Sequence, residues 1–394
     1  MSLDSRVVEQ SGNDVVPQPV DAVREDGRGA AHDAAPGAVR DAAPGAGPQP
    51  ARERRAAPSG NGAKRRPTIR DVAEVAGVSR GTVSRVINGG HWVSPDALAA
   101  VNEAIRTTGY AANQHARSLV TGRSNSIAFL LTEPQHLLFE DPNFSILLRG
   151  AAEELAKREM PLLLMVAGTP EERRRIGGYV AAGHVDGVLL ISSHQGNPML
   201  AELLKQKVPT VACGVPLGYE GRVGYVAADD RAGARTMTQH LLDSGRTRIA
   251  TITGPLDTPG GTLRLDGYRD ALGDRFDESL VAHGDYSRER GRLAMAELLE
   301  RRPDLDAVFV ASDLMAAGAL VALQASGRSV PGDVAVGGFD DSGVAASLHP
   351  ALTTMRQPFE RISAEMVRLL LEVVEGQEPA AITLPTSLVV RDSA

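Results

Sequence analysis

The stretch TIRDVAEVAGVSRGTVSRVIN, residues 68–88, carries two short helical patterns separated by a glycine. Thr68 can cap the first helix, because an acidic residue follows three positions later as in a capping box. Gly77 can end that helix, because glycine adopts the left-handed conformation without steric cost. Ser79 can cap the second helix, whose predicted inward positions are Val83, Val86 and Ile87.

A third helical pattern follows. Ser94 and Pro95 provide a cap and a proline at the first helical position, and Gly109 marks the end. Its predicted apolar face consists of Leu98, Val101 and Ile105. Three short helices with a tight turn between the first two predict a helix-turn-helix unit, whose second helix enters the major groove of DNA. A plain helical hairpin is the alternative that this pattern alone leaves open.

The charge distribution favours a polyanionic partner for the same region. The formal net charge is −7, yet residues 61–123 hold nine Lys and Arg against four Asp and Glu. A basic cluster near the start of this segment suits contacts with phosphate and consists of Lys64, Arg65 and Arg66. A solvated surface would show the same composition, so charge supports nucleic-acid binding without establishing it.

Composition excludes several other classes. The single cysteine, Cys213, excludes an intramolecular disulfide framework and a cysteine-built zinc site, and we expect neither metal nor cofactor. No apolar run approaches the roughly 18 to 20 residues of a membrane helix, and the N-terminus lacks a secretory pattern. We therefore expect a cytoplasmic, nucleoid-associated protein without a membrane partner.

The remaining sequence divides into a low-complexity start and an alternating body. Residues 1–64 are dense in Ala, Gly, Pro and Arg without apolar periodicity, which predicts a disordered extension. The body alternates helical stretches, such as residues 144–159 and 229–245, with the apolar runs SIAFLL, PLLLMVA, GVLLIS, TVACG, RIATITG, AVFVAS and VAVGGF. Such alternation predicts an α/β fold whose parallel sheets are covered on both faces.

Three linked motifs resemble the LacI/GalR family of transcriptional regulators: residues 68–88, VSPDALAAVNEAIRTTGY at 93–110, and ARSL at 116–119. The resemblance covers essentially residues 67–390. It implies an all-α helix-turn-helix head with a hinge helix, followed by two doubly wound parallel-sheet subdomains of the periplasmic-binding-protein-like type I. One departure from the family pattern is Ala112, where the family usually has proline.

The resemblance also implies domain boundaries. A DNA-binding domain at 65–111 and a hinge helix with its linker at 112–123 precede an effector-binding and dimerisation domain at 124–390. The last domain is expected to have three crossovers, near residues 227, 355 and 380. They would divide it into an N-subdomain of residues 124–227 and 356–379, and a C-subdomain of residues 228–355 and 380–390.

By the same resemblance, Arg80 and Gly81 occupy the two positions that read base edges. An arginine there can donate two hydrogen bonds to a guanine, whereas the glycine has no side chain to do so. Arg85 would continue the same face, with a contact to phosphate or solvent as its alternative role. The complete set of expected DNA contacts in the head is Thr68, Ser79, Arg80, Gly81, Thr82, Ser84, Arg85, Asn88 and Tyr110.

Leu119 matches the family's hinge leucine, which wedges into the minor groove where two hinge segments pair. Ala116 is small enough for a close approach there. The alternative role of Leu119 is the ordinary one for a leucine, which is packing in a hydrophobic core. This arrangement requires a homodimer and a near-palindromic operator with a flexible central step. We do not expect a tetramer, because no leucine-heptad tail follows residue 394.

The resemblance further implies an effector cleft at the carboxyl ends of the strands. Arg264 would clamp the ligand, and its alternative role is a salt bridge at the surface or between the subdomains. Asp340 would accept hydrogen bonds from the ligand, and its alternative role is a helix cap at the end of a strand. The aromatic walls would come from Tyr286, Phe144 and Phe359, each of which could equally be plain core. Two serines, Ser193 and Ser312, complete the expected effector-binding set.

These residues suit a polyhydroxylated sugar, because carboxylates accept and guanidinium donates hydrogen bonds. Loop 132–144 also resembles loops in actinobacterial regulators that respond to cellobiose. Two departures obscure the ligand: Ser312 stands where many members have asparagine, and Cys213 stands where some have a ligand-contacting aspartate.

We therefore expect a transcriptional regulator, most simply a repressor of carbohydrate-utilisation genes, released from double-stranded operator DNA by a mono- or oligosaccharide. A corepressor-dependent or purine- or nucleoside-responsive regulator is the alternative, and a sugar-binding protein or enzyme without a DNA role is more remote. Asp229 with Asp230, or Asp340 with Asp341, could imitate the carboxylate pair of a glycoside hydrolase. Adjacent strand residues point to opposite faces, however, so we expect no catalytic residues.

Overall fold

The computed structural model describes residues 65, 67–87, 92–110 and 123–394. The predicted extension at 1–64 and most of the predicted hinge lie outside these residues. The described residues of the head form three helices, α1 (Ile69–Ala76), α2 (Arg80–Ile87) and α3 (Pro95–Thr108). Its caps follow the sequence prediction: the Thr68 backbone N–H and hydroxyl both donate to the Asp71 carboxylate, and Gly77 is left-handed with φ of 66°.

The core of the head is built from one or two residues of each helix: Val72, Ala73, Val83, Val101 and Ala104. One predicted core residue is wrong. Leu98, in the first turn of α3, is 44% exposed, and the buried residues of this helix are Val101 and Ala104. Periodicity gives the direction of a side chain, but whether a neighbouring helix reaches that turn depends on how the three helices pack.

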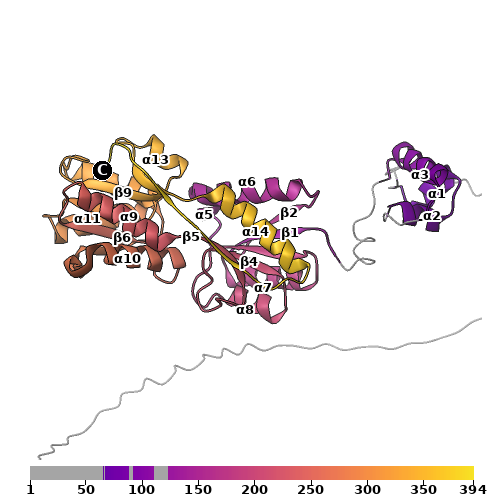
Figure 1. Ribbon diagram of the computed structural model, residues 1–394, viewed down its shortest axis with the longest axis horizontal. Coiled ribbons are helices and arrows are strands. Elements are labelled where there is room, and N and C mark those ends of the chain that lie inside the picture. The colour runs from indigo at the N-terminus through magenta and orange to yellow at the C-terminus, as the bar shows by residue number, and fades with distance from the viewer. Residues whose placement is uncertain (1–64, 66, 88–91, 111–122) are drawn as a thin grey trace, which may run out of the picture. The chain divides into compact units, whose positions relative to one another are not determined.

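The N-subdomain is a six-stranded sheet in the order β11-β5-β4-β3-β1-β2, with every neighbouring pair parallel. Its strands are β1 (Ile127–Leu131), β2 (Leu162–Val166), β3 (Gly187–Ile191), β4 (Thr210–Cys213), β5 (Gly224–Ala228) and β11 (Ala381–Leu384). The short helix α5 (Leu137–Glu140) follows β1. Around the sheet pack α6 (Pro142–Ala156), α7 (Pro170–Ala181), α8 (Pro198–Lys205) and α14 (Phe359–Val374) (Figure 1).

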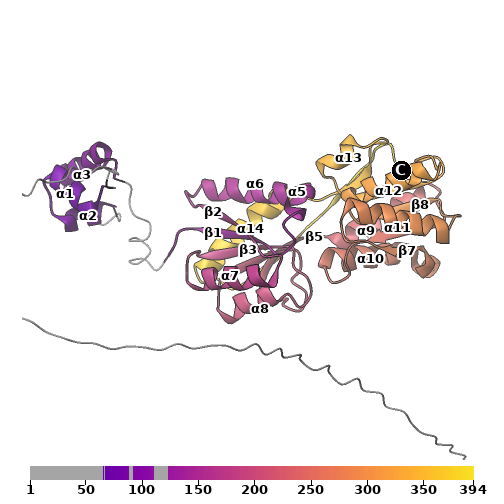
Figure 2. The ribbon, with the colours of Figure 1, turned by 180° about the vertical axis from the view of Figure 1, so that it is seen from behind.

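The C-subdomain is a second six-stranded sheet, in the order β12-β10-β9-β8-β6-β7, in which only β12 runs antiparallel. Its strands are β6 (Ile249–Thr253), β7 (Val281–His283), β8 (Ala307–Val310), β9 (Ala335–Asp340), β10 (Thr353–Arg356) and β12 (Ser387–Val389). Its α-helices, seen from both sides in Figures 1 and 2, are α9 (Asp230–Asp243), α10 (Pro259–Leu272), α11 (Arg288–Arg301), α12 (Asp313–Ala325) and α13 (Gly343–Ser347).

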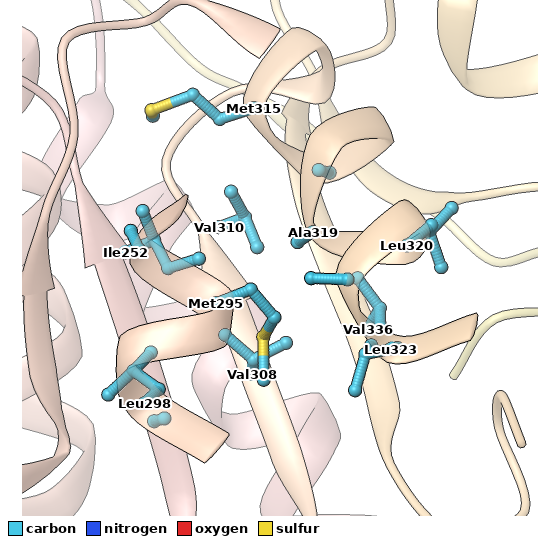
Figure 3. Packing of buried hydrophobic residues seen from close by; sticks show 14 of the residues in the cluster. Ile252, Met295, Leu298, Val308, Val310, Met315, Ala319, Leu320, Leu323 and Val336 are labelled. Carbon is cyan, nitrogen blue, oxygen red and sulfur yellow. The ribbon is translucent and has the colours of Figure 1, made fainter. Parts of the chain in front are cut away.

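The central strands of each sheet are buried on both faces, as the uninterrupted apolar runs predict. The edge strand β2 differs from this prediction, because its residues are at most half-buried and Leu164 is 45% exposed. Along β1, Ile127 and Phe129 pack on the side of α6 and α14, whereas Ala128 and Leu130 pack on the side of α7 and α8. Figure 3 shows the corresponding core of the C-subdomain, where strand residues meet side chains of α11 and α12, among them Met295, Leu298, Met315 and Leu323. Burial on both faces fixes each strand's position within its layer.

Three crossovers connect the subdomains, but the third lies later than predicted. The chain passes from β5 to α9 at Asp229 and from β10 to α14 at residues 357–358, close to the expected positions. The expected crossover near 380 is wrong, because β11 still pairs with β5, so the chain crosses between Leu384 and Ser387. The C-subdomain also continues past 390, since the buried Ser393 bonds to the backbone of Val336 and Thr353. The strand β11 escaped prediction because its mixed exposure gives it no continuous apolar run.

No helix within the described ranges is long and apolar enough to cross a membrane.

The contact between α11 and α12 requires glycine. A Cβ placed on Gly318 would lie 1.9 Å from the carbonyl oxygen of Arg288, whereas a Cβ on Gly178 of α7 would meet nothing within 4 Å. Gly318→Ala is therefore expected to destabilise the protein by about 1–3 kcal/mol. Gly178→Ala is expected to be neutral or stabilising by up to about 1 kcal/mol, because alanine favours a helix. Denaturant unfolding of both variants measures the difference, and equal stabilities would contradict the close approach of α11 and α12.

Candidate functional site

The outer surface of α2 presents the predicted base-reading residues. Arg80, Gly81 and Arg85 are exposed, while Thr82 and Ser84 are half-buried. A Cβ on Gly81 would meet only the Ser79 hydroxyl, at an ordinary 3.6 Å, so packing within the head does not require glycine there. The Nε of Arg85 donates to the carbonyl of Gly81 at 3.3 Å, which lays this side chain along the helix.

Other predicted DNA contacts of the head have structural partners of their own. The Ser79 hydroxyl accepts from the Thr82 backbone N–H at 3.1 Å and lies 2.9 Å from the Thr82 hydroxyl, so both side chains help to begin α2. Thr68 is exposed but bonded to Asp71, and Tyr110 is half-buried against the core of the head. Three further predicted contacts, Asn88, Ala116 and Leu119, lie outside the described residues.

A cavity between the two subdomains gathers all seven predicted effector-binding residues. Its walls include Phe144, Ser193, Arg264, Tyr286, Ser312, Asp340 and Phe359. We call this space the main cavity. With its open mouth included, the space measures about 830 Å³.

Arg264 is the central charged group of the main cavity. Its side chain is 8% exposed, and its Nε donates to Asp230 at 2.8 Å while Nη1 lies 3.5 Å from Asp340. Nη1 also donates to the carbonyl of Ala311, and the guanidinium lies 3.8 Å from the centre of the Phe339 ring. Burial opposes the charged form, yet the neighbouring acidic groups raise the pKa of Arg264 above its usual value, so it remains charged.

Aromatic side chains enter the main cavity from both subdomains. Tyr286 reaches it from the loop before α11, and burial raises the pKa of its hydroxyl to about 12, so it is a neutral donor. Gly254 leaves room for this ring, because a Cβ there would lie 2.2 Å from Tyr286 Cζ. Phe359 is buried and belongs to the core of the N-subdomain, while Phe144 is half-buried against the same core. The two phenylalanines therefore serve the core as well as the cavity wall.

The predicted serines differ in what they do. Ser312 begins α12 by accepting from the Met315 backbone N–H at 3.2 Å, whereas Ser193 is buried at the end of β3. Three cavity-lining residues that are not glycine have positive φ: Ser192 at 55°, Tyr286 at 69° and Asp340 at 120°. Such conformations are costly, and they cluster where the surrounding structure holds a side chain in a required direction.

Sequence reasoning missed several polar residues of the main cavity. Asp230 is the nearest carboxylate to Arg264, and Gln357 in the second crossover donates to Asp340 at 2.7 Å. Asn143 has a buried side-chain oxygen without a hydrogen-bond partner, which a ligand hydroxyl could satisfy. Asp141 caps α6 by accepting from the Asn143 N–H, and its position before Pro142 is a helix-start signal that could have identified it.

Adjacent carboxylates face different surroundings, as strand geometry predicts. Asp340 lines the main cavity, whereas Asp341 is bound by Arg356 and Arg391. Likewise, Asp229 caps α9 while its neighbour binds Arg264. The Cys213 thiol lines the cavity, and burial raises its pKa to about 12, which suppresses the thiolate. In the part of the chain that the structure describes, no group of three or more His, Cys, Asp or Glu could hold a metal.

Known proteins resemble both the head and the body. The pattern of bacterial regulatory proteins of the lacI family matches residues 68–113, and that of the periplasmic binding protein-like domain matches residues 238–394. The HTH-type transcriptional regulator CelR of Thermobifida fusca is 47% identical over 336 residues, covering 84% of this chain and 99% of its own. The chain belongs to the lacI family.

Solved structures of lacI-family proteins agree with this assignment. A transcriptional regulator CelR–cellobiose complex aligns with a TM-score of 0.68 at 45% identity, covering 84% of this chain and all of its own. A lac repressor dimer bound to operator and the anti-inducer ONPF aligns with a TM-score of 0.74 at 27% identity, covering 83% and 99%. The ribose operon repressor of Halalkalibacterium halodurans is 33% identical over 83% of this chain and 96% of its own. This lacI-family member is therefore a DNA-binding transcriptional regulator and not an enzyme, and the predicted α/β architecture is confirmed.

The pKa of Asp141 in this lacI-family cavity yields a prediction. Burial and then the nearby Asp340 raise it to about 7, Glu133 adds to the effect, and Arg264 opposes it. Because the folded state then holds this proton more tightly than the unfolded chain, folding stability falls as pH rises from about 4 to 7. Asp141→Asn keeps an acceptor for the Asn143 N–H but has no carboxyl group to titrate, so it removes this fall of stability with pH. It is expected to stabilise the protein by about 1–4 kcal/mol at pH 8 and hardly at all near pH 4.

Thermal melting of wild type and Asp141→Asn between pH 4 and 8 tests this expectation. Asp333→Asn is the control of opposite sign, because bonds from Ser329 lower the pKa of Asp333. Replacing the Asp333 carboxylate should therefore reduce the stability of the folded protein at neutral pH. A difference between wild type and Asp141→Asn that stays constant across the pH range would contradict the raised pKa.

Proposed function

We propose that this protein is a homodimeric repressor of carbohydrate-utilisation genes, released from a near-palindromic operator by a small neutral sugar. The observation that carries the effector assignment is the charge balance of the main cavity. Arg264 lies between Asp230 and Asp340, so its charge is already offset before a ligand enters. The remaining acceptors suit a ligand that brings hydroxyl donors rather than an anionic group.

The aromatic walls support the same ligand class. A pyranose ring has an apolar face made of C–H groups, and Tyr286 together with Phe144 offers flat surfaces for it. The relative solved with cellobiose and the relatives named as ribose operon repressors agree with a sugar effector. The lac repressor dimer on its operator supports a dimer on DNA.

The position of the main cavity between the subdomains explains how a sugar could act at a distance. Its walls come from both subdomains, which the chain connects through three crossovers, so a ligand that contacts both walls changes their relative orientation. The effect on DNA is a coupling free energy, and operator DNA must weaken sugar binding by the same factor. Release by a factor of about 10² to 10³ needs about 3 to 4 kcal/mol of differential binding.

Arg80 is the head residue that we propose as the main base reader. Arg80→Ala is expected to cost about 1–3 kcal/mol of operator affinity and to relax the preference at one base position. Arg106→Ala on α3 is the matched control, because Arg106 is exposed but paired with Glu103. Binding of selected operators and their single-base variants at fixed salt measures both effects. An equal loss for every sequence would make Arg80 a phosphate contact instead.

Operator release tests the effector. DNA is selected from a random pool, and its binding is repeated with matched mono- and disaccharides, including glucose with cellobiose and xylose with xylobiose. Release by one sugar is the expected outcome. Tighter binding with an added ligand would make the protein corepressor-dependent, and release by purines or nucleosides alone would replace the sugar.

Arg264→Lys is the variant for the same assay. Lysine keeps the positive charge that Asp230 and Asp340 require but loses the forked donors of arginine. The sugar concentration needed for release should rise at least about tenfold, while affinity for the operator alone stays within about twofold. Arg269→Lys on the same helix is the control, because Arg269 contacts Phe276 outside the cavity. Normal release of Arg264→Lys would remove Arg264 from the effector site.

A further inference from the structure

The only tryptophan of the chain lies between α2 and α3 in the head. Trp92 is 94% exposed, more than any other aromatic side chain in the described residues. Its side chain makes no hydrogen bond or ring contact to a described residue. An indole combines a large apolar ring with one N–H donor, which usually finds an acceptor when the ring is covered. The described residues of the head use neither the ring nor the donor.

The backbone of Trp92 is in an unfavourable conformation as well. Its φ is 83°, in the left-handed region that a bulky side chain rarely adopts. The chain directly after it is fixed, because the Ser94 side chain begins α3 by accepting from the Ala97 N–H at 3.3 Å. Strained residues of this kind cluster at binding sites, where the direction of a side chain matters more than its local cost.

The length of α2 indicates what Trp92 would meet on DNA. Its eight residues span about 12 Å, which is about the width of the major groove. The second helix of a helix-turn-helix unit points its N-terminal residues, here Arg80 and Gly81, at the base edges. The opposite end of α2, at Ile87, then reaches the edge of the groove. The chain that continues toward Trp92 leaves along a wall made of phosphates and deoxyribose sugars.

An indole suits this wall chemically. Phosphate oxygens accept hydrogen bonds from neutral donors as well as from cations, and such contacts fix the register of a protein on the duplex. The C–H groups of a deoxyribose offer an apolar surface for the ring. Because an indole carries no charge, its contact with a phosphate displaces no counterion, unlike that of a lysine or an arginine.

We propose that Trp92 is a DNA-backbone contact, whose ring packs on a deoxyribose at the edge of the major groove while its N–H donates to a phosphate. Trp92 then positions the head on the duplex without reading sequence, and it complements the base-reading residues at the other end of α2. This role is independent of the effector, so it is tested without sugar.

Fluorescence gives a direct test, because Trp92 is the single tryptophan of the full-length protein. Emission of the free protein should be that of a solvated indole. Titration with operator DNA selected from a random pool should quench or blue-shift it, with a midpoint equal to the Kd from an independent binding assay. Emission that stays constant up to saturation with DNA overturns the contact. Emission of a buried indole before DNA is added also overturns it, because another part of the protein then covers the ring.

Trp92→Ala should lower operator affinity by about tenfold, because it removes both the ring and a hydrogen bond to a charged group. Trp92→Phe keeps a ring and should lose only about threefold. The loss should be the same for the selected operator and its single-base variants. The slope of log affinity against log salt should stay at the wild-type value, because no charge is lost.

Phe139→Ala is the matched control, because Phe139 is an exposed aromatic residue on α5, outside the head. Its operator affinity should equal that of wild type. Trp92→Gly covers the case in which Trp92→Ala does not fold, since glycine accepts a positive φ without strain, and circular dichroism checks each protein. It should lose as much affinity as Trp92→Ala.

Unchanged operator affinity of Trp92→Ala or Trp92→Gly overturns the proposal. A loss confined to variants at one base position would make Trp92 a base reader and overturn the backbone assignment. A smaller salt slope for both variants overturns it too, because the substitutions would then act by displacing cationic contacts of the head rather than by removing a neutral one.

Discussion

The buried charge of Arg264 is the constraint on which the cleft depends. A guanidinium taken out of water must be matched by nearby acceptors, because removing one partner leaves an uncompensated charge in a low-dielectric interior. Arg264 meets this requirement with groups from three parts of the C-subdomain: Asp230 at the start of α9, the carbonyl of Ala311 after β8, and Asp340 at the end of β9. One side chain thereby fixes the relative positions of the carboxylates that line the main cavity.

The same network reaches the chain segments that join the subdomains. Gln357, in the second crossover, donates through its side chain to Asp340 and through its backbone to the Asp340 carbonyl. Asp341, the residue after Asp340, accepts hydrogen bonds from Arg356 at the end of β10 and from Arg391, which follows β12. The end of β9 therefore contacts both the ligand cavity and the second of the three connections, which gives effector binding a direct physical route to the orientation of the subdomains.

Much of the architecture followed from local rules. The caps at Thr68 and Ser94 and the glycines at 77 and 109 placed the helices of the head, because these residues satisfy or relieve the ends of helices through contacts only a few positions away. The apolar runs located the central strands, whose burial on both faces leaves no polar alternation. The short strand β11 and the exposure of Leu98 escaped prediction, because both depend on which distant segment lies beside them.

The sequence by itself determined the kind of protein: a helix-turn-helix head followed by two wound sheets, and through family resemblance seven residues that surround one cavity. Only the tertiary structure decided how those residues share their charges. The nearest partner of Arg264 is 34 positions away, and the main cavity takes its walls from segments separated by more than 200 residues. Such pairings depend on where the subdomains bring their strand ends together. Electrostatics and cavity shape act through space, whereas sequence patterns report only what lies within a few turns of the chain.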